Sequence, residues 1–237
     1  MIAAIFKIAG SLGLFLYGMK LLSDGLQKSA GDRIHAILNI MTGNRIAAIL
    51  SGFLITGIIQ SSSATTVMIV SFVNAGLLNL TQATGLIMGA NIGTTVTGWL
   101  VAIIGFKFNI TSIALPAIGI GLPLIFIKKL KKSELGETLI GFGVLFIGLD
   151  FLKNSVPDIR SNPQVLEFLS LYTDMGFLSY LIFVVAGIVI TVIIQSSSAA
   201  MAITITMAHA GWIDYPTAAA LILGENKIGR ASCRERV

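Results

Sequence analysis

Glutamine and serine side chains interrupt strongly apolar sequence twice, in the same order. The stretches are "GIIQSSSATT" at 57–66 and "VIIQSSSAA" at 192–200. Hydroxyls, amides and the backbone N–H groups of a helix N-terminus donate hydrogen bonds, so they suit an anion that must be held and then released. The same hydroxyls, with carbonyl groups freed where a helix breaks, suit a dehydrated Na⁺ ion.

Each polar motif also has a purely structural reading. Serine and threonine in membrane helices usually bond a carbonyl one turn back or a neighbouring helix. Two copies in equivalent positions favour a functional reading. "GANIGTTVTG" at 89–98 either packs helices closely through small residues or supplies oxygen ligands, and its echo "GEN" at 224–226 leaves both readings open. Glu225 makes a cation site plausible, because acids inside membrane helices are functional by default.

The composition indicates an integral membrane protein of the helical kind. Only 11% of the 237 residues are charged, against roughly 25% in soluble proteins, while 55% are hydrophobic. The mean hydropathy is +0.90. The net charge of +5 does not indicate nucleic acid, because basic residues gather between apolar runs, as in "KKLKK" at 128–132. That pattern is typical of a cytoplasmic loop.

Residues 45–80 are too long for one span and too polar in the middle. One helix of this length would extend ~54 Å at 1.5 Å per residue, whereas the hydrocarbon core is ~30 Å thick. A re-entrant hairpin, two half-helices with the QSSS at a joint buried in protein, resolves the mismatch. We predict a second hairpin at 178–213 and an interfacial segment at 23–44. We predict membrane spans at 2–22, 83–104, 110–127 and 138–153, and the start of another at 216–224.

The order of elements is the same in both halves, which indicates an internal repeat of about 130 residues. Three spans and one hairpin in the first repeat make the second repeat enter from the opposite side, so the repeats are inverted. The fold prediction is an all-α, polytopic membrane protein with inverted-topology repeats and two re-entrant hairpins carrying QSSS. The predicted boundaries are 1–127 for the first repeat, 128–137 for a basic cytoplasmic linker, 138–226 for an incomplete second repeat, and 227–237 for a non-native tail.

The paired QSSS motifs, with GANIGTT after the first and a near variant after the second, resemble the type II sodium/phosphate cotransporter family, specifically its bacterial members. The resemblance implies Na⁺-coupled symport of inorganic phosphate across the bacterial inner membrane by a multi-pass protein, with Na⁺ as coupling ion and no other cofactor. By match, the phosphate site comprises Gln60, Ser61, Ser62, Ser63, Gln195, Ser196, Ser197 and Ser198. The Na⁺ candidates are Thr65, Thr66, Asn91, Thr94, Thr95, Glu225 and Asn226.

The resemblance weakens after "GEN", where the chain continues "KIGRASCRERV" with five charges in eleven residues. This end resembles a translated cloning sequence. Other functions stay open beside phosphate symport: transport of another oxyanion, a passive anion channel or a structural membrane subunit. A serine hydrolase would need an activating base, and only His35 and His209 are available without a GxSxG elbow. We therefore expect no enzyme, no transition metal and no nucleic-acid partner; phosphate, Na⁺ and the lipid bilayer are the expected partners, and a homo-oligomer is left open.

Overall fold

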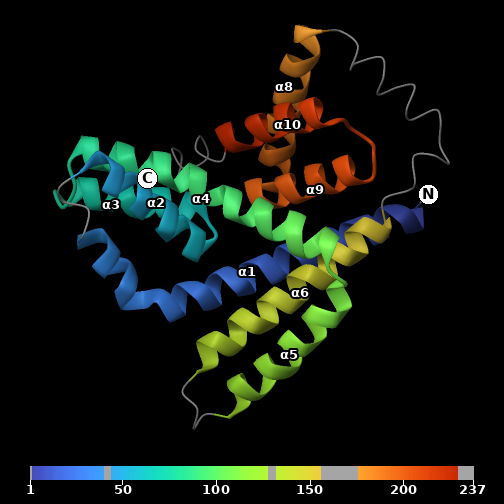
Figure 1. The fold of residues 1–237 in the computed structure, drawn as a ribbon, viewed down its shortest axis with the longest axis horizontal. Coiled ribbons are helices and arrows are strands. Elements are labelled where there is room, and N and C mark those ends of the chain that lie inside the picture. Colours follow the sequence, from blue (N-terminus) through green and yellow to red (C-terminus); the bar gives the residue numbers. More distant parts are fainter. Residues whose placement is uncertain (1, 40–43, 128–131, 156–175, 229–237) are drawn as a thin grey trace. The chain divides into compact units, whose positions relative to one another are not determined.

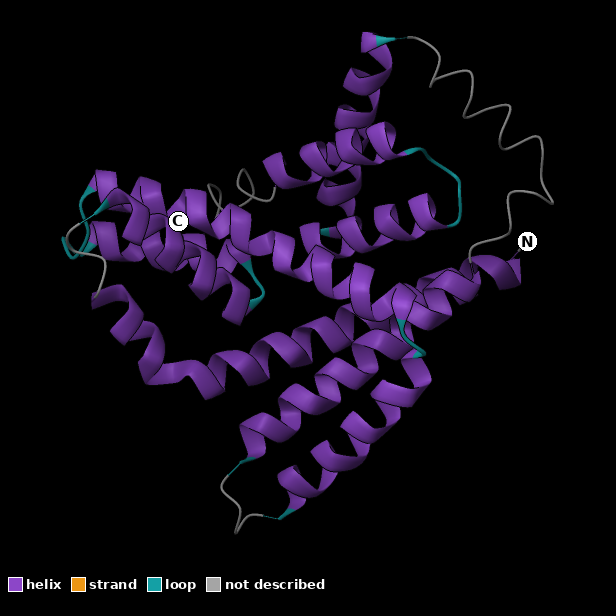
Figure 2. Ribbon diagram, in the orientation of Figure 1, coloured by secondary structure: helices purple, strands orange, loops and turns teal. Residues whose placement is uncertain are grey.

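A computed structural model describes residues 2–39, 44–127, 132–155 and 176–228, and all regular structure in these ranges is helical (Figure 2). The predicted all-α class is confirmed. Figure 1 labels the helices, which are α1 (Ile2–Asn39), α2 (Arg45–Ile59), α3 (Ser62–Asn74), α4 (Leu80–Lys107), α5 (Ile110–Phe126), α6 (Ser133–Ser155), α8 (Phe177–Ile194), α9 (Ser197–His209) and α10 (Tyr215–Ile228).

Among the described residues, α4, α6 and α8 are long and apolar enough to cross a membrane. The predicted spans at 83–104 and 138–153 correspond to α4 and α6. Helix α8, read from sequence as half of a hairpin, has 18 residues and could by length cross a membrane. The helices α2, α3 and α9 have 15, 13 and 13 residues and are too short to span alone. The re-entrant course of the two helix pairs therefore stays a prediction.

The first helix is longer than the sequence predicts. We expected a span at 2–22 followed by a separate interfacial segment, but α1 runs on to Asn39 and is kinked at Gly31, where φ is 9°. The prediction ended the span at Leu22 because the apolar run stops there, but the polar residues 23–30 are helical as well. Lys28, on this extension, donates a hydrogen bond to Glu137 of α6 at 2.6 Å. That bond raises the pKa of Lys28 above its ordinary value.

The described chain divides into two compact units, which cut across the helices α1 and α6. The repeat-1 unit is Leu14–Ile147, and the repeat-2 unit combines Met1–Gly13 with Gly148–Val237. This division follows packing and does not test the predicted repeat boundaries. The linker lysines at 128–131, the loop at 156–175 and most of the predicted tail lie outside the described residues.

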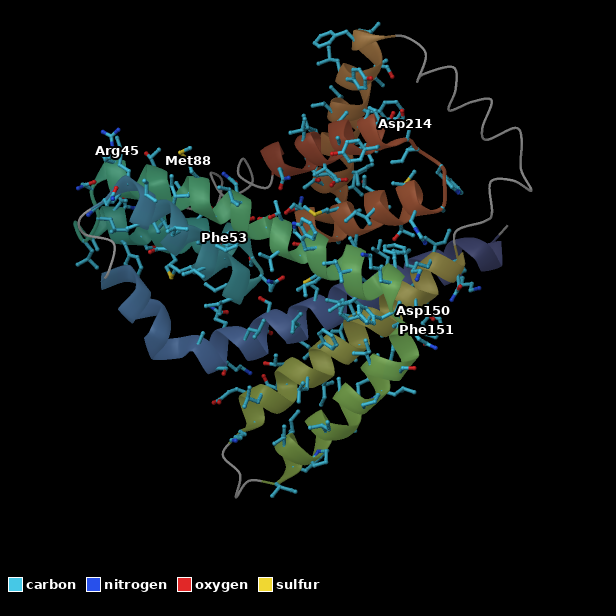
Figure 3. The ribbon with its side chains drawn as sticks, in the orientation of Figure 1. Arg45, Phe53, Met88, Asp150, Phe151 and Asp214 are labelled. Carbon is cyan, nitrogen blue, oxygen red and sulfur yellow. The ribbon has the colours of Figure 1, made fainter. Side chains whose placement is uncertain are left out.

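In the repeat-1 unit, α2 packs on α4 through glycines. A Cβ atom at Gly89 would collide with the carbonyl oxygen of Ile49, and one at Gly93 would lie 2.7 Å from Cβ of Thr56. Figure 3 labels Phe53, whose backbone nitrogen faces Gly89 in the same contact. The close-packing reading of the glycines in GANIG is thus confirmed for Gly89 and Gly93, since only glycine lets the two backbones approach this closely.

The repeat-2 unit has the same close helix contact through glycines. The glycines involved are equivalent in the two repeats when Gln195 is aligned with Gln60. Gly187 of α8 meets the carbonyl of Leu221, as Gly52 of α2 meets that of Leu86. Gly224 of α10 meets the carbonyl of Val184. The helices α8, α9 and α10 enclose their own core, which comprises Phe183, Ile213, Ala218, Ala220 and Leu221.

Candidate functional site

Each QSSS motif is a helix break, and the two breaks have the same backbone geometry. Gln60 ends α2 in the left-handed region, with φ 57° and ψ 21°. Gln195 ends α8 with φ 58° and ψ 21°. These are the only non-glycine residues with positive φ in the described chain. Non-glycine residues adopt this conformation at an energetic cost. Its recurrence at two equivalent glutamines indicates that both repeats break the helix in the same way.

A serine restarts the helix after each glutamine. Ser61 and Ser196 are extended, with φ −143° and −148°, and each side chain accepts a hydrogen bond from a backbone N–H three residues later. The Oγ of Ser61 is 3.3 Å from the nitrogen of Ala64, and that of Ser196 is 3.3 Å from Ala199. The second helix of each pair therefore begins within the motif, and its positive dipole end lies at the serines.

The glutamine side chains cap the helices that they end. Nε2 of Gln60 donates to the carbonyl of Gly57 at 2.5 Å, and Nε2 of Gln195 donates to that of Val192 at 2.6 Å. Each amide thus satisfies one of the carbonyl groups that a helix C-terminus leaves unpaired. Each amide nitrogen carries a second N–H donor, so both glutamines have a structural task in addition to their predicted binding role.

The two breaks differ in what surrounds them. Gln60 is buried, and its Oε1 accepts a hydrogen bond from Thr97 of α4 at 2.8 Å. The carbonyl of Ile59 accepts a bond from Ser23 of α1 at 2.5 Å. Gln195 is exposed within the described residues. The first break is therefore fixed by two further helices of its unit.

The threonines predicted to bind Na⁺ donate their hydroxyl hydrogens to their own helices. Such a hydroxyl cannot also donate to phosphate, but its lone pairs can still coordinate a cation. The structure is therefore compatible with a cation role and argues against an anion role for these side chains. The bonds run from Thr65 to the carbonyl of Ser61 (3.0 Å), Thr66 to Ser62 (2.8 Å), Thr94 to Ala90 (3.2 Å) and Thr95 to Ile92 (2.6 Å).

The remaining predicted residues are distributed over both units. Ser62 and Ser63 open α3, and Ser63 lies 3.2 Å from Ser61, Oγ to Oγ. Ser197 and Ser198 open α9. Asn91 on α4 and Asn226 on α10 are half-buried at equivalent positions. Within each unit the motif serines therefore lie together at one helix start.

Glu225 is fully buried in the repeat-2 unit, where Oε1 accepts a hydrogen bond from Thr204 of α9 at 2.6 Å. No sequence motif singles out Thr204. The contacts of Thr97 with Gln60 and of Thr56 with Thr65, whose hydroxyls lie 3.1 Å apart, were likewise not predicted. Comparison of the two repeats could have found Thr204. It replaces the apolar Ile69 of the first repeat, just as Glu225 replaces Ala90.

A model of the Na⁺/Pi-cotransporter family matches residues 14–154 and 163–233, which is most of the chain and includes both helix breaks. The chain belongs to the Na⁺/Pi-cotransporter family. The predicted resemblance is confirmed. The match extends to residue 233, into the segment expected to be a non-native tail.

Similar proteins of this family come from bacteria and mammals. YjbB of Salmonella typhimurium, named as a candidate inorganic phosphate export protein, is 29% identical over 94% of this chain and 39% of its own length. YqeW of Bacillus subtilis, an uncharacterised protein, is 32% identical over 90% of this chain and 66% of its length. The sodium-dependent phosphate transport protein 2A of Rattus norvegicus is 41% identical over 40% of this chain and 15% of its length.

This member of the Na⁺/Pi-cotransporter family spans less than two thirds of the length of these relatives. No solved structure matches it.

Proposed function

We propose that this protein is a Na⁺-coupled transporter of inorganic phosphate in the bacterial inner membrane. The observation that carries the proposal is the pair of matching helix breaks at Gln60 and Gln195, each followed by a serine-capped helix N-terminus. Helix N-termini bind phosphate because their free N–H groups and positive dipole end favour an anion. Family membership agrees with this substrate.

In the proposed site, the serines following the cap act as donors to phosphate. Ser62 and Ser197 are half-buried first residues of their helices, so both the hydroxyl and the backbone N–H are near the helix opening. Ser61 and Ser196 hold the turn through their capping bonds. Phosphate held by neutral donors can be released again, as transport requires. The proposed Na⁺ ligands are Thr65, Thr66, Asn91, Thr94 and Thr95 in the repeat-1 unit, and Glu225 and Asn226 in the repeat-2 unit.

The test is phosphate flux in liposomes that contain the purified protein. Radiolabelled phosphate is offered with an inward Na⁺ gradient, an outward Na⁺ gradient, or equal Na⁺ on both sides, with choline balancing the salt. Coupled transport moves phosphate down the imposed Na⁺ gradient, whichever direction it has. The names of the bacterial relatives include phosphate export, so both gradient directions are needed to define the direction of transport.

A passive anion channel is the alternative in which phosphate moves at the same rate with Na⁺ and with choline and does not saturate. A transporter of another oxyanion is recognised by competition, because hydroxyl and N–H donors distinguish tetrahedral oxyanions by size and charge. Sulfate and arsenate are therefore added in excess to labelled phosphate. Stronger inhibition by sulfate than by unlabelled phosphate would replace phosphate as the proposed substrate.

A further inference from the structure

One buried pair is apolar in the repeat-1 unit and polar in the repeat-2 unit. In the repeat-1 unit, Ile69 of α3 and Ala90 of α4 are buried, with 0% and 1% of their surface exposed. The equivalent residues of the repeat-2 unit are Thr204 of α9 and Glu225 of α10, with 1% and 0% exposed. An apolar pair in one repeat is thus a hydroxyl and a carboxyl group in the other.

The carboxyl group of Glu225 is only half satisfied by the protein. Oε1 accepts the hydrogen bond from Thr204 at 2.6 Å. Oε2 is buried and has no hydrogen-bond partner among the described residues. Buried polar atoms are normally paired, so an unpaired carboxylate oxygen requires an explanation, and an unplaced ion is one of the accepted ones.

The helices packed against Glu225 supply no charge to balance it. Helix α10 packs on α8 and α9, and residues 177–209, which include both helices, contain no Asp, Glu, Lys or Arg. Their titratable residues are Tyr180 and His209, which are both exposed. On α10 itself, the other titratable residue whose side chain is described is Tyr215, which is exposed.

We propose that a Na⁺ ion binds between α9 and α10, coordinated by Oε2 of Glu225 and the Oγ1 lone pairs of Thr204. A single carboxylate balances the charge of a monovalent cation, whereas Ca²⁺ and Mg²⁺ sites in proteins recruit more oxygen ligands and more negative charge. The inference rests on the proposed Na⁺ coupling and deepens it, because it assigns a coupling ion to the repeat-2 unit. In the repeat-1 unit the equivalent residues, Ile69 and Ala90, are apolar, so this unit lacks the two proposed ligands.

The repeat-1 unit provides the decisive variant. The double change Thr204→Ile and Glu225→Ala recreates the pair that already packs at Ile69 and Ala90, so it preserves folding. The purified full chain in detergent is melted in NaCl, KCl and choline chloride at equal ionic strength. We expect Na⁺ to raise the melting temperature of the unchanged protein above its value in KCl or choline chloride, and the double variant to lose this difference.

Single variants separate the two ligands. Glu225→Gln keeps the size of the side chain and removes its charge, and we expect it to abolish the Na⁺-specific rise. Thr204→Val keeps the shape and removes the hydroxyl oxygen, which should raise the half-saturating Na⁺ concentration roughly tenfold. Asp150→Asn is the matched acid-to-amide control on α6, because the hydrogen bond that Asp150 accepts within the described residues comes from Asn154 on its own helix, at 3.4 Å. It should leave the Na⁺ response unchanged.

The outcomes distinguish this site from the transport proposal. An equal rise in NaCl and KCl, no rise in the unchanged protein, or a Na⁺-specific rise that survives in the double variant overturns the site. Phosphate flux is measured in parallel on the same preparations. A Na⁺-specific rise that depends on Glu225, without any Na⁺-dependent flux, upholds the site and refutes the proposed coupling. Na⁺-dependent flux that Glu225→Gln leaves unchanged upholds coupling and refutes the site.

Discussion

The hydroxyl of Thr97 donates a hydrogen bond to Oε1 of Gln60 at 2.8 Å, and this contact joins the first helix break to α4. Both residues are buried, with 3% and 7% of their surface exposed. The same glutamine amide donates to the carbonyl of Gly57. The Gln60 side chain therefore donates to a carbonyl at the end of its own helix and accepts a bond from a neighbouring helix. These two hydrogen bonds explain how a glutamine with left-handed backbone is held inside a membrane protein.

Thr97→Val should destabilise the protein. The change leaves Oε1 of Gln60 buried without a donor, and an unsatisfied buried acceptor costs about 1–3 kcal/mol. We expect a lower free energy of unfolding in detergent, measured by denaturation. Thr95→Val is the control, because Thr95 is exposed and its hydroxyl donates to the carbonyl of Ile92 on its own helix, so this change should have a smaller effect. Equal effects of the two changes would contradict a special role for the Gln60 contact.

Glycine should be tolerated better at Gln195 than at Gln60. Glycine relieves the left-handed backbone at either position, a gain of about 1–2 kcal/mol. At Gln195 the change removes one local bond to Val192. At Gln60 it also removes the acceptor for Thr97 inside the unit. We therefore expect Gln60→Gly to have the lower melting temperature of the two variants, and the reverse order would show that the α4 contact contributes little.

The threonine pair Thr56 and Thr65 has lost a member in the second repeat. Thr56 donates to Thr65 at 3.1 Å, whereas its equivalent Thr191 has a buried Oγ1 without a partner among the described residues, because Ala200 replaces Thr65. Thr56→Val should destabilise the protein by about 0.5–1.5 kcal/mol. Thr191→Val should be neutral or stabilising, since it removes an unpaired polar atom. Denaturation of both variants checks the difference, and a larger loss for Thr191→Val would contradict it.

Ser62→Ala and Ser197→Ala should each weaken phosphate binding while leaving expression intact. Each change deletes a donor to an anion, worth about 1.5–3 kcal/mol, so the apparent phosphate affinity should fall roughly tenfold or more. Phosphate flux kinetics in liposomes measure it. If both serines bind the same phosphate, the double variant should show non-additive losses. Unchanged kinetics in both single variants would leave the serines with the purely structural role.

The inverted repeat is tested by labelling from either side of the membrane. Cysteines placed at 128–132 should react with an impermeant thiol reagent only from the cytoplasm, and cysteines placed at 158–174 only from outside, after Cys233 is replaced. An odd number of crossings between the two segments requires opposite sides. Labelling of both segments from one side would refute the predicted inverted topology.

The sequence alone determined the helical class, the positions of both breaks and the equivalence of the two halves. These features are local: apolar runs predict helices, a serine favours a helix start, and a repeated QSSS marks repeated geometry. The close packing through Gly89 and Gly93 was one of two open readings. The sequence prediction ended the first helix too early, because the apolar run stops at Leu22 while the helix continues through polar residues to a kink at Gly31.

Only the tertiary structure decided which polar side chains are already committed to other parts of the protein. Gln60 and Thr97, and likewise Thr204 and Glu225, are far apart in the chain and meet through helix packing. No local pattern encodes such a meeting, because it depends on which helix faces pack and how closely glycines let them approach. The packing gives Gln60 a capping role beside its predicted phosphate role, and it leaves one oxygen of Glu225 buried without a hydrogen-bond partner among the described residues.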